Sequence, residues 1–527
     1  MTQSILSRRA AVAAAVGAVF AGVGGSALAA SNLNSYTMVG AGASSVQNTV
    51  TVIVLEKYCS HSSSTPSLYG TGTSSLAAGG APGDTTVRIQ CAQNASSGLS
   101  NPIDISYDTS GGAWKAFTAS NPALLTGGAQ TTANANPVVS VNTSTNCVAN
   151  PTQPVSAVIL GNTISINYYY NCAPYTLNPT AYPSTDQVTF GLAGDPQLYE
   201  DTTNNQPLVN NSWNTAPANI FTGSGGTASF STNYENELVI SNGTAYNGYQ
   251  FPVQVFGVVF GLAASPALYK ALQTDQINNS VLPSTCQVSG TPVVSAACAP
   301  SVSKAAYRSI VGQFHGSLNG NANHLFITNP GVTGINLELV RRDQGSDAQS
   351  SSNAYFLGDG CNSTVESNAS PLLPVSGSSW ITYLPTTSAA VKELNSPTLH
   401  TYAIGVVSTE KDNGKNLTGG AGFLKIGGVY PSPANAAAGL YDYVTEENLH
   451  FNANPPNLVD ATQFATDLIN VDSTLSAWAY SGTGIVQINS SWSEQGGSIV
   501  DGSGNPANPT AAFSNGGLQC QGWADYL

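Results

Sequence analysis

The sequence predicts an α/β fold with parallel strands, divided between two or more lobes. Residues 36–55 and 103–119 each contain an apolar strand, a loop rich in glycine and serine, and a helix. Strand–loop–helix units in succession are typical of parallel sheets covered by helices. The chain has 527 residues, which is more than a single hydrophobic core usually organises.

The N-terminus has the pattern of an export signal. Arg8 and Arg9 precede a run of small apolar residues at 10–21, and residues 27–29 fit the small-x-small pattern of a cleavage site. The run is too short to cross a membrane as a helix. We therefore expect a signal peptide at residues 1–29, handled by the general or the twin-arginine route. The mature chain would lie in the periplasm or outside the cell, without a membrane span.

The composition limits the partners of the mature chain. Of the 14 basic residues, removal of Arg8 and Arg9 leaves 12 against 28 acidic ones, which gives a net charge of −16. Such a charge argues against nucleic acid and anionic membranes as partners. It does not exclude a small anion, because local donors decide that.

Eight cysteines in an exported chain predict structural disulfides. None has the Cys-x-x-Cys spacing of a redox or zinc site, so we expect no metal and no other cofactor. The sequence does not fix the connectivity. Pairing of neighbours is the simplest choice and gives Cys59–Cys91, Cys147–Cys172, Cys286–Cys298 and Cys361–Cys520.

Hydrophobic periodicity predicts the remaining elements. Two polar segments, at about 60–100 and 121–187, interrupt the α/β pattern and are interpreted as β-rich insertions. Further strands are predicted at 138–141, 163–170, 188–195, 251–262, 335–340, 399–407, 423–426 and 444–451. Further helices are predicted at 265–274, 304–314, 434–443 and 460–480.

The most informative stretch is residues 339–347, LVRRDQGSD. Two adjacent arginines, Arg341 and Arg342, are unusual in a chain with so few basic residues, and they follow an apolar strand directly. The turn after them contains Gly345 and Ser346. A guanidinium group beside free backbone N–H groups is suited to holding an oxyanion. The alternative is a surface loop whose own charges pair.

Three further loops place polar residues directly after predicted strands. Serine hydroxyls and the backbone amides at the start of a helix are donors for an anion, and a carboxylate can accept a proton from a protonated one. The same residues could simply cap helices, so that interpretation stays open. The residues are Ser44, Ser110 with Gly111, and Asp195.

Taken in order, these anchors resemble the phosphate-binding proteins of bacterial phosphate ABC transporters, in the type II periplasmic-binding-protein superfamily. The insertions and the tail after about residue 460 have no counterpart. The matching pieces are residues 40–44, 107–112, 190–195, 251–262, 341–346, 403–407 and 423–451.

The resemblance implies a two-lobed trap that closes about a hinge. Residues 30–254 would form the first part of lobe I, 255–401 lobe II, and 402–527 the second part of lobe I with a C-terminal extension. Residues 251–259 and 402–407 would cross between the lobes. The implied ligand set is Ser44, Ser110, Gly111, Asp195, Arg341, Gly345 and Ser346. Asp195 would accept the proton of a monoprotonated phosphate, which a sulfate lacks.

One departure from the family bears on the ligand. The family's arginine loop ends in Gly-Thr, where this chain has Ser346 and Asp347. A carboxylate about 4 Å from an anion would cost on the order of 4 kcal/mol at an effective dielectric of 20. Phosphate binding would then depend on neutralisation of Asp347 by Arg342.

Two functions follow from these observations. The first is an exported, monomeric solute-binding protein for phosphate or a related oxyanion, with an ABC permease as its partner. The alternative is a secreted or surface interaction protein that keeps the fold without phosphate transport. We do not expect an enzyme, since the chain has no Gly-x-Ser-x-Gly elbow and its five histidines lack metal-ligand spacing.

Overall fold

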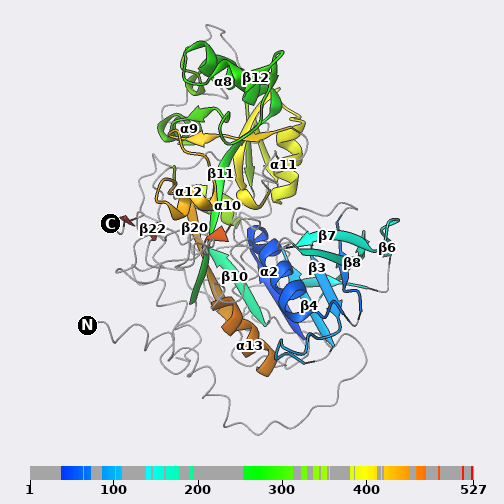
Figure 1. Ribbon diagram of the computed structural model, residues 1–527. Helices are drawn as coiled ribbons and strands as arrows, with labels where there is room; N and C mark the ends of the chain where they lie inside the picture. The colour runs from blue at the N-terminus through cyan, green and yellow to red at the C-terminus, as the bar shows by residue number, and fades with distance from the viewer. Residues whose placement is uncertain are drawn as a thin grey trace, which may run out of the picture.

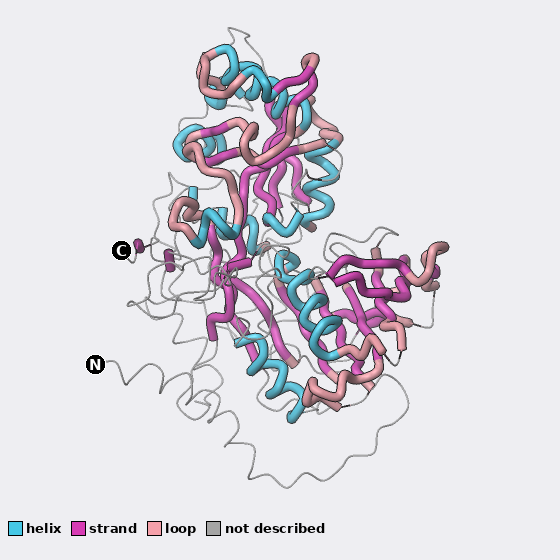
Figure 2. The backbone as a smooth tube through the Cα atoms, viewed as in Figure 1, coloured by secondary structure: helices cyan, strands magenta, loops and turns pink. Residues whose placement is uncertain are grey.

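The computed structural model is a mixed α/β structure whose main sheet contains both parallel and antiparallel strands (Figures 1 and 2). No described helix is both long and apolar enough to cross a membrane. The structure describes residues 37–62, 64–72, 86–100, 102–109, 138–143, 146–159, 162–176, 189–194, 253–312, 322–328, 336–342, 346–352, 355–356, 380–384, 386–411, 417, 420–451, 458–469, 485–486, 513–514 and 524–525.

The lower part of the sheet is built around β1, Met38–Gly42, which pairs in parallel with two neighbours. They are β4, Ile103–Asp108, and β10, Phe190–Gly194. Beyond β4 the order continues with β3, Val87–Cys91, β2, Ser67–Gly70, and β8, Asn162–Tyr170. Beyond β10 lies β20, Val444–Phe451, antiparallel to it.

The strand β11, Val253–Ala264, belongs to both parts of the sheet. Its first half, up to Val259, pairs with β20, and its second half, from Phe260, pairs with β17, Tyr402–Ser408. The upper part then continues in parallel with β15, Leu337–Arg342, and β16, Ile381–Leu384. Figure 1 shows β11 running between the two groups of elements.

Short strands extend these groups or form small ladders of their own. They are β5 (Val139–Val141), β6 (Val148–Ala149), β7 (Val155–Ile159), β9 (Pro174–Thr176), β12 (Gln287–Val288), β13 (Thr291–Pro292), β14 (Ser301–Val302), β18 (Gly422–Phe423), β19 (Lys425–Ile426), β21 (Ile485–Val486), β22 (Phe513–Ser514) and β23 (Ala524–Asp525).

Helices follow several of the main strands. The helix α8 has Pro266 in its first turn, and the Ser265 hydroxyl accepts from the Leu268 amide, so this start is a capped one. The helical segments are η2 (Ser44–Val46), α2 (Gln47–Ile53), η3 (Val54–Tyr58), α8 (Pro266–Asn278), η7 (Ser284–Cys286), α9 (Lys304–Gly312), η8 (Ala322–Leu325), α10 (Asp347–Ser352), α11 (Thr387–Asn395), η10 (Thr409–Lys411), α12 (Pro433–Ala437) and α13 (Leu458–Ile469).

Aromatic side chains fill the core where α13 covers the lower part of the sheet. The Phe464 ring lies 4.6 Å from that of Phe190 and 5.8 Å from that of Tyr58, centroid to centroid. The Tyr58 hydroxyl also donates to Asp467 over 2.6 Å, which fixes α13 against the end of the first helix.

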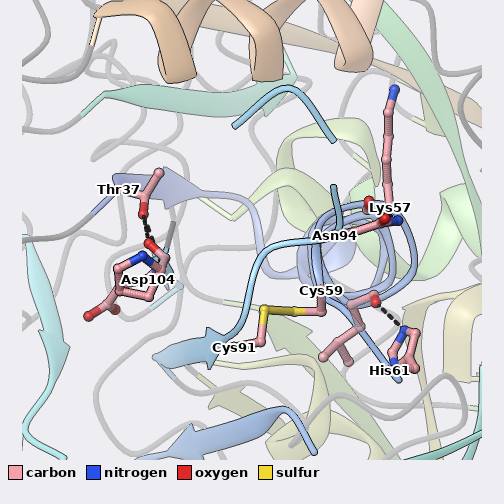
Figure 3. Close-up of a disulfide and its surroundings, with 9 residues drawn as sticks. Thr37, Lys57, Cys59, His61, Cys91, Asn94 and Asp104 are labelled. Carbon is pink, nitrogen blue, oxygen red and sulfur yellow. Dashed lines mark hydrogen bonds between the residues drawn. A yellow bond between two sulfur atoms is a disulfide. The ribbon is translucent and has the colours of Figure 1, made fainter. Parts of the chain in front are cut away.

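Three of the four expected disulfides are confirmed: Cys59–Cys91, Cys147–Cys172 and Cys286–Cys298. Figure 3 shows the first, which joins the end of η3 to β3. Beside it, the His61 ring lies against the carbonyl of the preceding helix, with 2.7 Å between Nε2 and the Leu55 oxygen. Cys361 and Cys520 lie outside the described residues.

The predicted elements are found in order, with some corrections. The helix predicted at 434–443 is short and ends at Ala437, because Gly439 adopts a left-handed conformation with φ +69° that terminates it. Within the segment at 60–100, β2 and β3 extend the sheet beside β4. The helix predicted at 113–119 lies outside the described residues.

The strand β17 pairs with β15 and with the second half of β11, within the upper part of the sheet. The strand that pairs with the lower part after this point is β20.

Candidate functional site

The carboxyl ends of the parallel strands in both parts of the sheet meet at one place. In the lower part, β1 leads to Ser44; in the upper part, β15 leads to Asp347 and β16 to Thr387. Ligands of open α/β sheets bind in the crevice outside the carboxyl ends of the strands. This edge is therefore the candidate site.

Two contacts join the lower strand ends to the upper ones. The hydroxyl oxygens of Ser44 and Thr387 lie 3.3 Å apart, and the Ser45 hydroxyl donates to Asp347 Oδ2 over 3.2 Å. All four side chains are buried. Their polar atoms are thus held within reach of one another from elements more than 300 positions apart in the chain.

Arg342 places its guanidinium group at this junction. Nη1 donates to Thr387 Oγ1 over 2.5 Å, and Nε donates to the Leu384 carbonyl oxygen over 3.2 Å. Its backbone N–H donates to Gln349 over 3.3 Å, which ties the end of β15 to α10. Arg342 and Ser44 therefore meet at one hydroxyl, that of Thr387.

The neighbouring Arg341 is also buried, and its charge acts on the phenol of Tyr307. It lies close enough to Tyr307 of α9 to oppose the rise that burial causes in the pKa of that phenol. Successive strand residues point to opposite faces, which separates the two arginines. Ser346 is buried at the start of α10, where its carbonyl oxygen accepts from the Gln349 amide over 3.0 Å.

Asp347 is the acidic centre of the site. Burial raises the pKa of its carboxyl group, while hydrogen bonds from Glu447 and Ser45 and the charge of Arg342 act in the opposite direction. A Cβ atom on Gly194, the last residue of β10, would lie 2.5 Å from Asp347 Oδ1. The close approach of the carboxyl group thus requires glycine at position 194.

Glu447, Thr387 and Arg342 are residues that sequence reasoning did not assign to the ligand set. Glu447 is fully buried on β20, opposite Gly194 in the ladder. A signal was available, because two adjacent glutamates lie within the strand predicted at 444–451, in a chain with only 8% charged residues. Nothing in the sequence marks Thr387.

Tyr107 lies beneath this junction, on β4. Its hydroxyl donates to the Ala43 carbonyl oxygen over 3.0 Å. Its pKa is raised well above the ordinary value, first by burial and then by the carboxyl groups of Glu447, Asp108, Asp347 and Glu410. The lower wall of the site is therefore acidic, and the phenol stays neutral.

Four of the predicted ligand residues, Ser110, Gly111, Asp195 and Gly345, lie outside the described residues. The strands that they follow, β4, β10 and β15, end at the candidate site. Within the described ranges, no group of three His, Cys, Asp or Glu side chains could hold a metal ion.

Comparisons with known proteins give solved structures only; no family model and no curated protein matches the chain. A putative phosphate ABC transporter substrate-binding protein from Clostridium perfringens, solved with bound phosphate, is 12% identical, with a TM-score of 0.27, over 45% of this chain and 72% of its own. An ABC-type phosphate transport receptor from Vibrio cholerae is 14% identical, with a TM-score of 0.24, over 42% and 70%. PstS from Borrelia burgdorferi is 12% identical, with a TM-score of 0.27, over 45% and 71%. Similarities this low do not support a function for this chain. A function has to be argued from the contacts described above.

Proposed function

We propose that this chain is an exported solute-binding protein that closes two lobes over a small anion, phosphate or a related oxyanion. The lobes are the lower and upper parts of the sheet with their helices. The observation that carries the proposal is the meeting of Ser44 and Arg342 at the Thr387 hydroxyl, because it brings donors from both parts to one point.

These donors have the chemistry that an oxyanion needs. A guanidinium group can give two parallel N–H bonds to an oxyanion, and bonds that involve a charged group are the stronger ones. The hydroxyls of Ser44 and Thr387 add neutral donors without adding charge. In the closed arrangement these groups bond to one another, and a bound anion would replace those bonds.

The strand β11 gives the two lobes a connection about which they could move. It pairs with β20 below and β17 above, so a change in its twist near Val259 and Phe260 would rotate one lobe against the other. Hinges of this kind need only a few residues that absorb the change.

Export, a monomeric state and delivery to an ABC permease belong to the same proposal. The leader pattern at residues 1–29 and three disulfides support a periplasmic or extracellular location.

A second candidate function is an interaction protein that keeps this fold without transporting phosphate. It is favoured by one observation: the polar groups at the junction are bonded to each other, Ser44 and Arg342 to Thr387, and Ser45 to Asp347. Such bonds would hold the lobes together without a ligand.

Thermal unfolding with and without phosphate separates the two functions. A ligand of the folded state stabilises it by RT ln(1 + [L]/Kd), about 2.7 kcal/mol at 100-fold saturation. Arg342→Ala should remove most of that shift, whereas Arg308→Ala, on the exposed face of α9, should keep it. Arg341→Ala, run in parallel, tells whether the second arginine contributes. Sulfate at the same ionic strength controls for salt. If phosphate does not shift the wild-type protein, phosphate is excluded as the ligand; if no related oxyanion shifts it either, the interaction protein becomes the leading function.

A further inference from the structure

Two carboxyl groups lie beside the arginine of the proposed anion site. Asp347 and Glu447 are both buried, and a hydrogen bond from Glu447 and the charge of Arg342 oppose the rise that burial causes in the pKa of Asp347. A hydrogen bond between two carboxyl groups requires that one of them carries a proton. A plain oxyanion bound at Arg342 would therefore face acidic groups that repel it.

An independent observation at the same point concerns Thr445, two residues before Glu447 on β20. Its hydroxyl is buried, with 1% of the residue exposed, and has no hydrogen-bond partner within the described part of the chain. The methyl group of Thr445, bound to the same Cβ as this hydroxyl, and the Asp347 carboxyl group lie on one side of Gly194: a Cβ atom on this glycine would lie 2.8 Å from Thr445 Cγ2 and 2.5 Å from Asp347 Oδ1. A buried hydroxyl without a partner is rare in folded proteins and indicates a place for a polar group.

The charges at this junction are divided between two sides. Arg342 donates to the Thr387 hydroxyl, which contacts that of Ser44. Asp347 and Thr445 lie beside Gly194, the ladder partner of Glu447. The first side donates hydrogen bonds and carries positive charge. The second side consists of oxygen atoms that accept them and carries negative charge when ionised.

We propose that the ligand of this site is a small zwitterion, with an oxyanion group on Arg342, Thr387 and Ser44 and an ammonium group on Asp347, Glu447 and Thr445. The inference rests on the proposed solute-binding function and names the class of its ligand. An ammonium group replaces the shared proton of the two carboxyl groups and has three N–H donors, enough for both carboxyl groups and the Thr445 hydroxyl. The acidic residue that opposes a simple anion then contributes to binding.

The test compares two ligands of equal shape. In 2-aminoethylphosphonate an ammonium group stands where propylphosphonate has a methyl group, and inorganic phosphate serves as the third ligand. Titration calorimetry on the wild-type protein should give 2-aminoethylphosphonate an affinity about ten-fold or more above that of propylphosphonate, because hydrogen bonds between charged groups are strong when buried.

Variants then locate the preference. Asp347→Asn keeps the shape of the side chain and removes its charge, and should bring the two phosphonates to within about two-fold of each other. Thr445→Val removes only the hydroxyl and should reduce the preference in part, which provides a test if Asp347→Asn folds poorly. Asp275→Asn on α8, away from the junction, should leave the preference unchanged.

The outcomes distinguish failure of the zwitterion inference from failure of the solute-binding function. Equal binding of the two phosphonates by the wild-type protein, with phosphate also bound, would overturn the zwitterion inference and leave the anion-binding function in place. A preference for the amine that survives Asp347→Asn and Thr445→Val would also overturn the inference. Failure of all three ligands to bind would overturn the solute-binding function and the inference with it.

Discussion

Two buried arginine–aspartate arrangements in this protein differ in how their hydrogen bonds are distributed. In the lower part of the sheet, Arg88 of β3 faces Asp104 of β4 with two parallel bonds, Nε to Oδ1 at 2.7 Å and Nη2 to Oδ2 at 2.6 Å. Gln90 adds a third bond to the same carboxylate over 2.9 Å. Both charges are compensated within one pair of adjacent strands.

At the candidate site, Arg342 and Asp347 form hydrogen bonds with groups of other elements. Arg342 donates to the Thr387 hydroxyl and to the Leu384 carbonyl oxygen, and Asp347 accepts from the Ser45 hydroxyl. The partners come from both parts of the sheet. A bidentate pair on neighbouring strands stabilises one sheet, whereas charges that bond to hydroxyls of distant elements can exchange those partners for a ligand.

The largest effect should come from breaking the compact pair. Asp104→Ala would leave the guanidinium group of Arg88 buried without its carboxylate, and loss of one partner of a buried pair costs about 3–5 kcal/mol. Urea unfolding of this variant beside the wild-type protein measures the loss. Asp275→Ala, on the half-buried surface of α8, is the matched control and should change stability far less. A loss below about 1 kcal/mol for Asp104→Ala would mean that the pair is not a structural anchor.

A smaller loss is expected at the candidate site. Arg342→Ala removes bonds to one hydroxyl and one carbonyl oxygen, which should cost about 1–2 kcal/mol in the absence of ligand. The same urea titration measures it. A loss equal to that of Asp104→Ala would show that Arg342 is as much a structural residue as Arg88, and the contrast between the two arrangements would disappear.

The smallest effect should be a pH dependence at Asp347. Because its pKa is raised from the ordinary value of 3.8 by burial, the folded protein binds this proton more tightly than the unfolded chain does. The stability that this group contributes is present below the ordinary value and is lost as the pH rises through the raised one. Asp347→Asn should therefore be more stable than the wild-type protein at pH 8, and the difference should shrink towards pH 4. A difference that does not change with pH would contradict the buried, proton-binding role of Asp347.

The sequence was sufficient to predict where along the chain the strands that build this site occur. Apolar runs ending in Gly-Ser loops predicted β1, β4 and β15, and the ladders confirm that β1 and β4 are parallel. The length of α12 could not be predicted from its apolar pattern, since Gly439 ends it by its backbone conformation.

The partners across the site could not be predicted, for two physical reasons. Adjacent strand residues face opposite sides, and only the register of β15 decides that Arg342 meets Thr387 while Arg341 acts on Tyr307. The Ser44–Thr387 contact joins residues 343 positions apart, a distance over which local patterns carry no information. The departure at Asp347 was visible in the sequence, but its burial against Glu447 was not.

Because β11 pairs with both parts of the sheet, residues cannot be inserted into it or deleted from it without disturbing one of the two parts. Inserting or deleting one residue near Val259 would keep the ladder on one side and turn every later side chain of the strand to the opposite face. The side chains of residues 256 and 258–264 of β11 are almost completely buried, whichever face of the sheet they lie on. Neither face could therefore accommodate side chains moved to it from the other. The number of residues in β11 is therefore fixed by both parts of the sheet at once.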